Sequence, residues 1–383
     1  MKGENVDILF PAEWAPQSAV QLTWPHEDTD WAPILEEVIP CFVSIAHEII
    51  KREKLLIVCA DQEIVKQQLG DVDYSKVIFR EMDTNDTWAR DHGGISVFID
   101  GTPAVYDFVF NGWGMKFAAD KDNLITRRLF MSDTFADEVL PLNMQPFVLE
   151  GGSLESDGKG TLLTTAECLL SLNRNEYLCR EEIENQLKDI FGFKQVLWLE
   201  SGYLAGDDTD SHVDTLARLC NEDTIAYVKC DDETDEHFAE LKEMEEQLKE
   251  FRTLDNKPYK LIDLPMADKV EWNGDRLPAT YANFLIINGF ILDVFVVGED
   301  SFNHFVFFLF QLLCFFHRIT PTTVFSFLHF QQIIVFQLHQ LRCLSFGKLN
   351  QLLRILHFLR SMVFQNVFNN GRFLSRKRQT ANQ

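Results

Sequence analysis

Four acidic residues and one histidine lie within eight residues of the chain, at Asp207–Asp214 (DDTDSHVD). A histidine beside carboxylates has a raised pKa and can act as a general acid near neutral pH. His212 and Asp214 are two positions apart, so on a strand both side chains would point to the same face. Clustered acids also attract calcium, but the spacing does not match the loop D-x-[DN]-x-[DN]-G-x5-E. We favour acid–base chemistry here, and a calcium site or a solvated acidic loop stays open.

A second candidate segment is Asn85–Gly94, which reads NDTWARDHGG. It places an aromatic residue, a cation and two acids before a glycine pair and a strand-like run. A carboxylate such as Asp91 can bind a planar guanidinium through two parallel hydrogen bonds. The alternative is a structural ion pair between Arg90 and Asp91 near a turn, and the local residues alone favour that alternative.

Glu150 is a third candidate, because it follows the apolar run Phe147–Leu149 and precedes two glycines. Paired glycines let the backbone turn sharply or approach a ligand closely. The carboxylate is therefore well placed for catalysis, although an ordinary exit from a strand explains the pattern equally well. Cys168 has apolar neighbours on its C-terminal side, which is more typical of a core cysteine than of a nucleophile.

Alternating strand-like and helix-like segments must position these motifs. Short apolar runs predict strands at 55–59, 76–79, 94–99, 104–110, 196–199, 225–229, 259–264 and 283–287. Helical spacing predicts helices at 35–51, 181–191 and 235–252, with a kink or restart at Pro40. Asp157-Gly158 is typical of a hairpin turn. The mixture indicates α/β or α+β architecture, and no G-x-G-x-x-G motif supports a dinucleotide fold.

The composition excludes some partners. The chain has 383 residues and a net charge of −24, which disfavours nucleic acid and anionic membrane surfaces as partners. An acidic balance suits a cationic substrate only weakly, since many enzymes are acidic for solubility alone. Eight cysteines are scattered without a C-x-x-C pair, and no apolar leader is visible at the N-terminus. We therefore expect a cytoplasmic protein with reduced thiols.

The composition changes abruptly near residue 300. All 59 acidic residues precede residue 301, whereas residues 301–383 hold nine Lys or Arg and 16 of the 33 Phe. Phe305–Phe316 is almost wholly apolar but too short to span a bilayer. Residues 349–359 have the spacing of an amphipathic helix, and 372–383 are basic, polar and expected to be disordered.

An ordered set of segments resembles the agmatine deiminase family, which is related to bacterial-type peptidylarginine deiminases. The matching segments are Phe10–Trp14, Thr23–Pro25, Asn85–Gly94, Asn111–Gly114 with Lys116, Glu150–Ser153, Asp157–Thr161, Glu167–Asn175, Asp207–Asp214 and Leu277–Phe284. They cover roughly residues 8–289. One segment would be weak evidence, but the whole set in this order is highly specific.

The resemblance implies an α/β fold, the five-bladed pseudo-symmetric propeller of the penteins, with its last blade incomplete or replaced. It also implies hydrolysis of a guanidinium to a urea with release of ammonia. Asp91 and Asp214 would clamp the guanidinium, His212 would be the general acid and base, and Glu150 would bind the substrate or orient His212. The remaining contacts would come from Asp208, at the far cationic end of agmatine, and from Trp88, as a wall of the pocket. No metal or organic cofactor is implied, and a homo-oligomer stays open.

The family's nucleophile, a cysteine in a G-x-x-H-C-x-T-type segment near the C-terminus, has no match in this chain. Cys314 and Cys343 stand in unrelated surroundings (QLLCFFHRI and HQLRCLSFG). We therefore expect a truncated catalytic domain at 1–298 and a tail at 299–383 that is foreign to the family. We expect little or no deiminase activity. The alternatives are a protein-arginine deiminase and a non-catalytic remnant that binds guanidines or polyamines.

Overall fold

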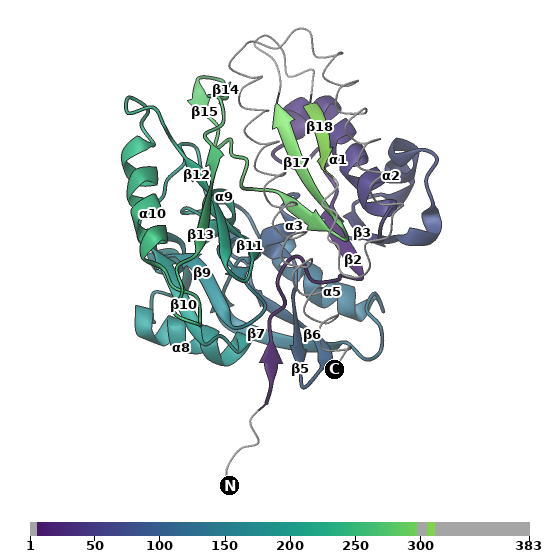
Figure 1. Cartoon of the computed structure of the whole chain (residues 1–383). Helices are drawn as coiled ribbons and strands as arrows, with labels where there is room; N and C mark the ends of the chain where they lie inside the picture. Colours follow the sequence, from purple (N-terminus) through teal and green to yellow (C-terminus); the bar gives the residue numbers. More distant parts are fainter. Residues whose placement is uncertain (1–5, 297–304, 311–383) are drawn as a thin grey trace, which may run out of the picture. The chain divides into compact units, whose positions relative to one another are not determined.

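Small sheets joined by helices make up residues 6–296 and 305–310, the part of the chain that the computed structural model describes (Figure 1). One unit comprises Met1–Asn288 together with Leu292–Leu309. A second unit, Gly289–Ile291 with Phe310–Gln383, falls almost wholly outside the described residues. The helix expected at 349–359 and the disorder expected at 372–383 also fall outside them. Every helix in the described part is too short or too polar to cross a membrane.

The first sheet is parallel, with helices between successive strands. Its strands in spatial order are β2 (Ala19–Thr23), β3 (Lys54–Cys59) and β4 (Val77–Glu81), and its helices are α1 (Leu35–Ile50) and α2 (Gln62–Leu69). Every residue of β3 except Lys54 is buried, which is why this strand reads as an uninterrupted apolar run. Of the kink or restart expected at Pro40, the restart is wrong, because α1 continues through it, and the kink stays a prediction. Buried positions on both sides, including Val38 and Ala46, hold the helix against its neighbours.

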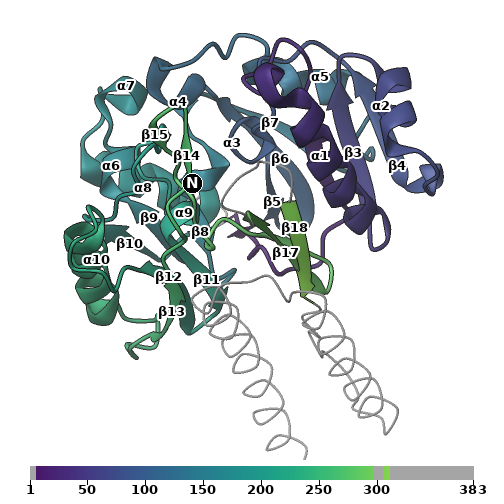
Figure 2. The same cartoon turned by 90° about the horizontal axis from the view of Figure 1, so that it is seen from above.

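Three further sheets share one chain order: an antiparallel strand pair, then helices, then a strand parallel to the second of the pair. The first of these sheets consists of β5 (Ile95–Ile99), β6 (Thr102–Val109) and β7 (Leu140–Val148), with α5 (Ile125–Met131) before β7. The second consists of β8 (Glu155–Ser156), β9 (Thr161–Thr165) and β10 (Gln195–Leu199), with α8 (Arg180–Phe191) before β10. The third consists of β11 (Ala217–Asn221), β12 (Thr224–Lys229) and β13 (Lys260–Pro265), with α10 (Phe238–Glu250) before β13. The short β1 (Ile8–Leu9) adds to the edge of β5. Figure 2 shows α10 beside β12 and β10, two strands that it contacts. These elements confirm the predicted strands and helices and the hairpin turn at Asp157-Gly158.

The last described sheet has the order β16 (Leu285–Ile287), β17 (Phe290–Val296) and β18 (Phe305–Phe310), and a separate hairpin pairs β14 (Glu271–Trp272) with β15 (Asp275–Arg276). The segment that leads into β16 is tied to the start of the chain. Arg218 donates to the carbonyls of Ala282 (2.9 Å) and Phe284 (2.8 Å), and it also bonds Glu13. Glu13 in turn accepts from the backbone N–H of Ile286 at 3.1 Å. The buried Arg218 and the partly buried Glu13 together fix residues 282–286.

An aromatic core supports the middle sheets. Tyr106, Phe108, Phe191 and Phe193 are all buried, and neighbouring rings lie 5.4–5.8 Å apart. Such spacing suits edge-to-face and offset contacts between rings. The same core contains Leu149, Leu154 and Cys168. The backbone on both sides of Glu150 is therefore held by packing.

Most of the candidate residues lie on single-turn helices or directly before them, rather than on the longer elements. These turns are α3 (Ala89–His92), α4 (Gly112–Met115), the 3₁₀ turn Gly151–Ser153, α6 (Ala166–Leu169), α7 (Leu172–Asn175) and α9 (Val213–Leu216). The turn Gly151–Ser153 packs against both α3 and α9. Segments far apart in sequence therefore meet around it.

Candidate active site

Asp91, Glu150 and His212 come together in one buried cluster. The imidazole lies between the two carboxylates: Nδ1 is 3.5 Å from Asp91 Oδ1, and Nε2 is 3.3 Å from Glu150 Oε2. All three side chains are at least nine-tenths buried. Both ring nitrogens of His212 therefore face a carboxylate, which favours the protonated, doubly donating imidazolium.

Asp214 reaches the same place from the first turn of α9. The expectation that His212 and Asp214 lie on one strand is wrong, because His212 precedes α9 and Asp214 lies within it. The side chains of His212 and Asp214 instead converge on Gly152. A Cβ built on Gly152 would meet His212 Nδ1 at 2.4 Å, Asp91 Oδ1 at 2.7 Å and Asp214 Oδ2 at 3.1 Å. Only glycine leaves these three groups room to converge.

The Asp91 carboxylate is held by two donors. Trp113 Nε1 donates to Oδ2 at 3.0 Å, and the backbone N–H of Gly152 donates to Oδ1 at 3.1 Å. Burial raises the pKa of Asp91, against the opposing positive charge of His212. The two bonds fix the orientation of the carboxylate, with Oδ1 toward His212.

Arg174 is the counterion of Glu150. Its Nε donates to both Glu150 oxygens, at 3.1 and 2.8 Å, and its Nη1 donates to Asp210 at 2.5 Å. Nη2 donates to the carbonyl of Thr209 at 2.9 Å. The side chains of Arg174 and Glu150 are both fully buried. Arg174 thus joins Glu150 to the acidic segment that precedes His212.

The charges of this cluster shift the pKa values of His212 and Glu150 in opposite directions. Burial alone would lower the pKa of His212, but the negative charge of Asp91 and the contact with Glu150 raise it well above its ordinary value. Burial alone would raise the pKa of Glu150, but the bond to His212 and the charge of Arg174 hold it below its usual range. Near neutral pH the pair is therefore an imidazolium and a carboxylate, an acid poised to give up a proton.

Arg90 does not pair with Asp91, so the structural ion pair favoured by the local sequence is wrong. Its Nε lies 3.4 Å from Asp214 Oδ2, and its other nitrogens lie 3.2 Å from Glu13 and 3.5 Å from Glu155. The one-turn helix α3 directs neighbouring side chains apart, which separates Arg90 from Asp91. Asp214 is thus held by a fixed cation on one side and faces Gly152 on the other.

The remaining acids of Asp207–Asp214 do not share one cation. Asp207 accepts from the backbone N–H groups of Thr209 and Ser211 at 3.1 and 2.7 Å. Asp210 pairs with Lys116 and Arg174, both at 2.5 Å. Asp208 is exposed, and its carbonyl accepts from Lys116 at 2.7 Å. The separate partners argue against the calcium alternative, because calcium needs six to eight converging oxygens.

Trp88 lies one residue before α3 and is 44% exposed. Its ring makes an edge-to-face contact with Trp113, with centroids 6.3 Å apart, and its Nε1 donates to Asp86 at 3.1 Å. Burial raises the pKa of Asp86 to about 6. Trp88 is therefore joined through Trp113 to the Asp91 carboxylate and stands at the outer side of the cluster.

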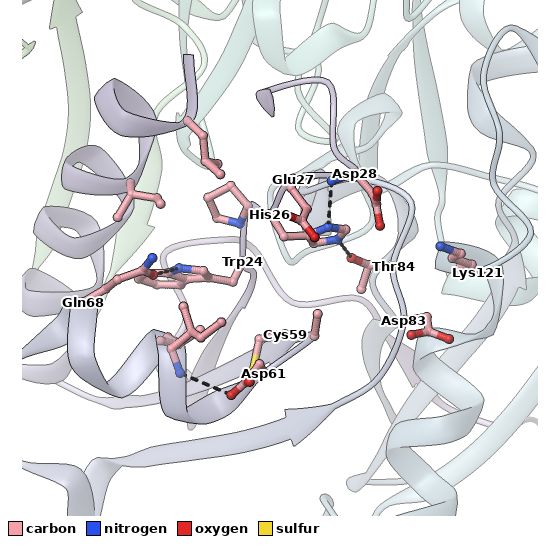
Figure 3. Close-up of a pocket in the computed structure, with 16 residues that line it drawn as sticks. Trp24, His26, Glu27, Asp28, Cys59, Asp61, Gln68, Asp83, Thr84 and Lys121 are labelled. Carbon is pink, nitrogen blue, oxygen red and sulfur yellow. Dashed lines mark hydrogen bonds between the residues drawn. The ribbon is translucent and has the colours of Figure 1, made fainter. Parts of the chain in front are cut away.

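A cavity of about 360 Å³ lies elsewhere, at the carboxyl ends of β2, β3 and β4 beside α1 and α2 (Figure 3). Its polar groups largely bond one another: Trp24 to Gln68 at 2.7 Å, and His26 to Thr84 at 2.9 Å. None of the four carboxylate and imidazole groups described above lines it. We therefore assign the chemistry to the buried cluster, where acid, base and counterion meet.

Sequence reasoning did not single out Arg174, Trp113 or Gly152 as functional residues. Arg174 belonged to a segment interpreted as structural, although a buried acid such as Glu150 requires a cation somewhere. Cys168 is buried in the core, as expected, but its Sγ also lies 3.7 Å from Glu150 Oε2. The signal that was available was their position in segments that match the family: Trp113 in Asn111–Gly114, Gly152 in Glu150–Ser153 and Arg174 in Glu167–Asn175.

Comparison with known proteins gives one consistent result. Residues 9–300 match the Porphyromonas-type peptidyl-arginine deiminase family. A Vibrio parahaemolyticus protein assigned as an agmatine deiminase is 32% identical, over 77% of this chain and 86% of that protein. A solved structure of C. jejuni agmatine deiminase, a cysteine-to-serine variant with substrate bound, is 38% identical with a TM-score of 0.70, over 76% of this chain and 84% of that one. A Porphyromonas gingivalis structure assigned as an arginine deiminase is 55% identical with a TM-score of 0.72, over 74% and 84%.

Proposed function

This chain belongs to the Porphyromonas-type peptidyl-arginine deiminase family, and we propose that its buried cluster is an agmatine deiminase site. The reaction of such a site is hydrolysis of agmatine to N-carbamoylputrescine and ammonia, in the biosynthesis of putrescine. The observation that carries the proposal is the convergence of Asp91, Glu150, His212 and Asp214 around Gly152. A flat cation is the ligand that such a set of acids suits best.

In this proposal Asp91 and Asp214 hold the guanidinium nitrogens from two sides. Trp113 and the Gly152 N–H fix the Asp91 carboxylate before any ligand arrives, so little orientational entropy of this side chain is lost on binding. Asp214 exchanges part of its contact with Arg90 for the ligand. The central carbon of the guanidinium would then lie close to His212.

His212 acts as the general acid. Its two carboxylate neighbours stabilise the imidazolium, which donates the proton that converts the departing nitrogen to ammonia. Glu150 keeps the imidazole in place, and Arg174 keeps Glu150 ionised. Trp88 would wall the site, and Asp208 would contact the distant ammonium of agmatine.

The nucleophile is missing from this proposal. The family forms a covalent amidino-cysteine, and the C-terminal G-x-x-H-C-x-T-type segment that supplies the thiol has no counterpart here. Cys168 does not replace it, because it is fully buried beside Glu150 and burial raises the pKa of its thiol. We therefore propose that this chain binds agmatine and turns it over at a negligible rate. That favours a second candidate function, a guanidine-binding protein without catalysis.

We also propose that the five main sheets are the blades of a pentein propeller whose last blade is altered. The family match ends at residue 300, which is also the last acidic residue. Residues 299–383 would then be foreign to the family, through a shifted reading frame or an alternative exon. Reading the underlying nucleic acid tests this, and the idea fails if no nearby frame or exon encodes a family-like ending.

A cytoplasmic location is part of the same proposal. The six cysteines that the structure describes are all free, which suits a reducing compartment. Fractionation of cells that express the full chain, with detection of the chain in the soluble cytoplasmic fraction, tests the proposed location.

Calorimetry and ammonia assays on the full chain separate the two candidate functions. We expect agmatine to bind, binding to be lost in Asp91→Asn, and ammonia release to equal that of His212→Ala. Ammonia release above the His212→Ala control would contradict the missing nucleophile. Absence of agmatine binding would contradict the site itself. Stronger binding of an arginine-containing peptide than of agmatine would assign the chain to protein-arginine deiminases instead.

A further inference from the structure

We propose that Glu150, Cys168 and His212 form a binding site for a divalent cation of borderline softness, with Zn²⁺ as the best match. One ligand atom from each residue lies within 4.8 Å of the others, and all three residues are buried. Glu150 Oε2 is 3.7 Å from Cys168 Sγ and 3.3 Å from His212 Nε2. Zinc ligands at about 2.0–2.3 Å in a tetrahedron stand about 3.3–3.7 Å apart. The two separations from Glu150 Oε2 already match those that the ion requires, and the third pair of atoms lies within 4.8 Å.

The surroundings supply the second layer of contacts that metal ligands need. A metal-bound histidine usually presents its other ring nitrogen to a carboxylate, which fixes the ring. Here Nε2 faces Glu150, and Nδ1 faces Asp91 at 3.5 Å. Arg174 would give up its bond to Glu150 Oε2 and keep the one to Oε1 at 3.1 Å. Its remaining donors stay on Asp210 and Thr209.

The chemistry of the ligands selects the ion. A thiolate and an imidazole suit zinc, whereas calcium and magnesium require oxygen ligands. Zinc binding would replace the proton of the Cys168 thiol and the Nε2 proton of the His212 imidazolium, and both protons would leave to solvent. The Cys168 thiolate and the Glu150 carboxylate then bring two negative charges, which balance the two positive charges of the ion. Three protein ligands leave the fourth position to water, as in open zinc sites.

The proposal goes beyond guanidine binding and depends only on the cluster geometry. An ion bound to Glu150 and His212 would occupy the groups that agmatine needs. Zinc and agmatine should therefore exclude one another.

Titration of the full, metal-free chain with Co²⁺ tests the site without any substrate. Co²⁺ bound to a thiolate gives a charge-transfer band in the near ultraviolet, and Zn²⁺ should abolish that band by competition. Cys168→Ser should lose the band and bind Zn²⁺ at least about 100-fold more weakly, and Asp91→Asn should weaken binding about 10–100-fold. Cys179→Ser is the matched control, because that free thiol is exposed. This variant should leave the cobalt band and the Zn²⁺ affinity unchanged.

X-ray absorption of the zinc-loaded native chain provides a test that needs no variant. We expect one sulfur at about 2.3 Å and nitrogen or oxygen at about 2.0–2.2 Å. A shell without sulfur overturns the proposal. So does a cobalt band that survives in Cys168→Ser or is absent from the native chain. Cys168→Ser should lose metal binding and keep agmatine binding, so the two proposals fail separately.

Discussion

Replacing Arg174 with methionine should strongly destabilise the fold, because it leaves a buried carboxylate without its counterion. The Arg174 guanidinium contacts both oxygens of Glu150 and one of Asp210, and it also bonds the carbonyl of Thr209. Neither Arg174 nor Glu150 has an exposed side chain, so water cannot replace these bonds. Methionine has a similar length and no donors.

Removing one partner of a buried ion pair costs about 3–5 kcal/mol. Glu150 keeps its contact with His212 at 3.3 Å, so we place the loss at the lower end, about 3 kcal/mol. For a domain of this size each kcal/mol lowers the melting temperature by about 2–4 °C, so we expect a fall of about 6–12 °C.

Thermal and urea unfolding, followed by circular dichroism, measure the effect. Lys257→Met is the matched control, because its pair with Asp255 is 3.4 Å long with both side chains more than 70% exposed. It should cost less than about 1 kcal/mol. Arg174→Lys should fall between the two, since lysine keeps the charge and loses the fork of donors. Equal midpoints for Arg174→Met and Lys257→Met would refute the reasoning.

Three further changes probe the centre of the cluster. Gly152→Ala should abolish agmatine binding in calorimetry, because the new methyl group meets His212 and Asp91 within 2.7 Å. The same crowding should lower the free energy of unfolding in urea by about 1–3 kcal/mol. The control is Gly101→Asn, which has open space around it and should leave agmatine binding intact. Trp113→Phe removes one donor to a carboxylate and should weaken agmatine binding by about 1.5–3 kcal/mol, whereas unchanged affinity would show that the bond does not orient Asp91. Asp91→Asn should lower the pKa of His212, as followed by NMR. Because the folded-state pKa of His212 is raised, the stability that its protonation contributes is complete below the unfolded pKa of about 6.5 and declines as pH rises through the folded pKa. In Asp91→Asn, urea unfolding at increasing pH should show a smaller decline of stability.

The regular elements could be predicted because each carries a repeating apolar signal. β3 is buried on both faces, and α8 alternates buried positions such as Ile183 and Leu187 at helical spacing. The short turns that hold the site have no such period, because four residues make only one turn. That is why His212 and Asp214 were expected on a strand.

The acids of the site could be predicted, whereas their partners could not. Carboxylates near glycine pairs, such as Asp91 and Glu150, can be recognised in the amino-acid sequence. A counterion such as Arg174 is chosen by three-dimensional proximity and lies 24 residues from Glu150. Arg90 shows the converse, because adjacency in sequence suggested a partner that the backbone turn excludes.

The tie between Arg218, Glu13 and the backbone at 282–286 has a consequence for how such an enzyme can lose its reaction. These bonds anchor the end of the ligand-holding portion to the beginning of the chain. Under the proposed function, in which the thiol-bearing segment follows this portion, recognition and bond cleavage reside in separable stretches of polypeptide. A change confined to the later stretch would leave a receptor where there had been a catalyst, with no need to rebuild the grip on the ligand.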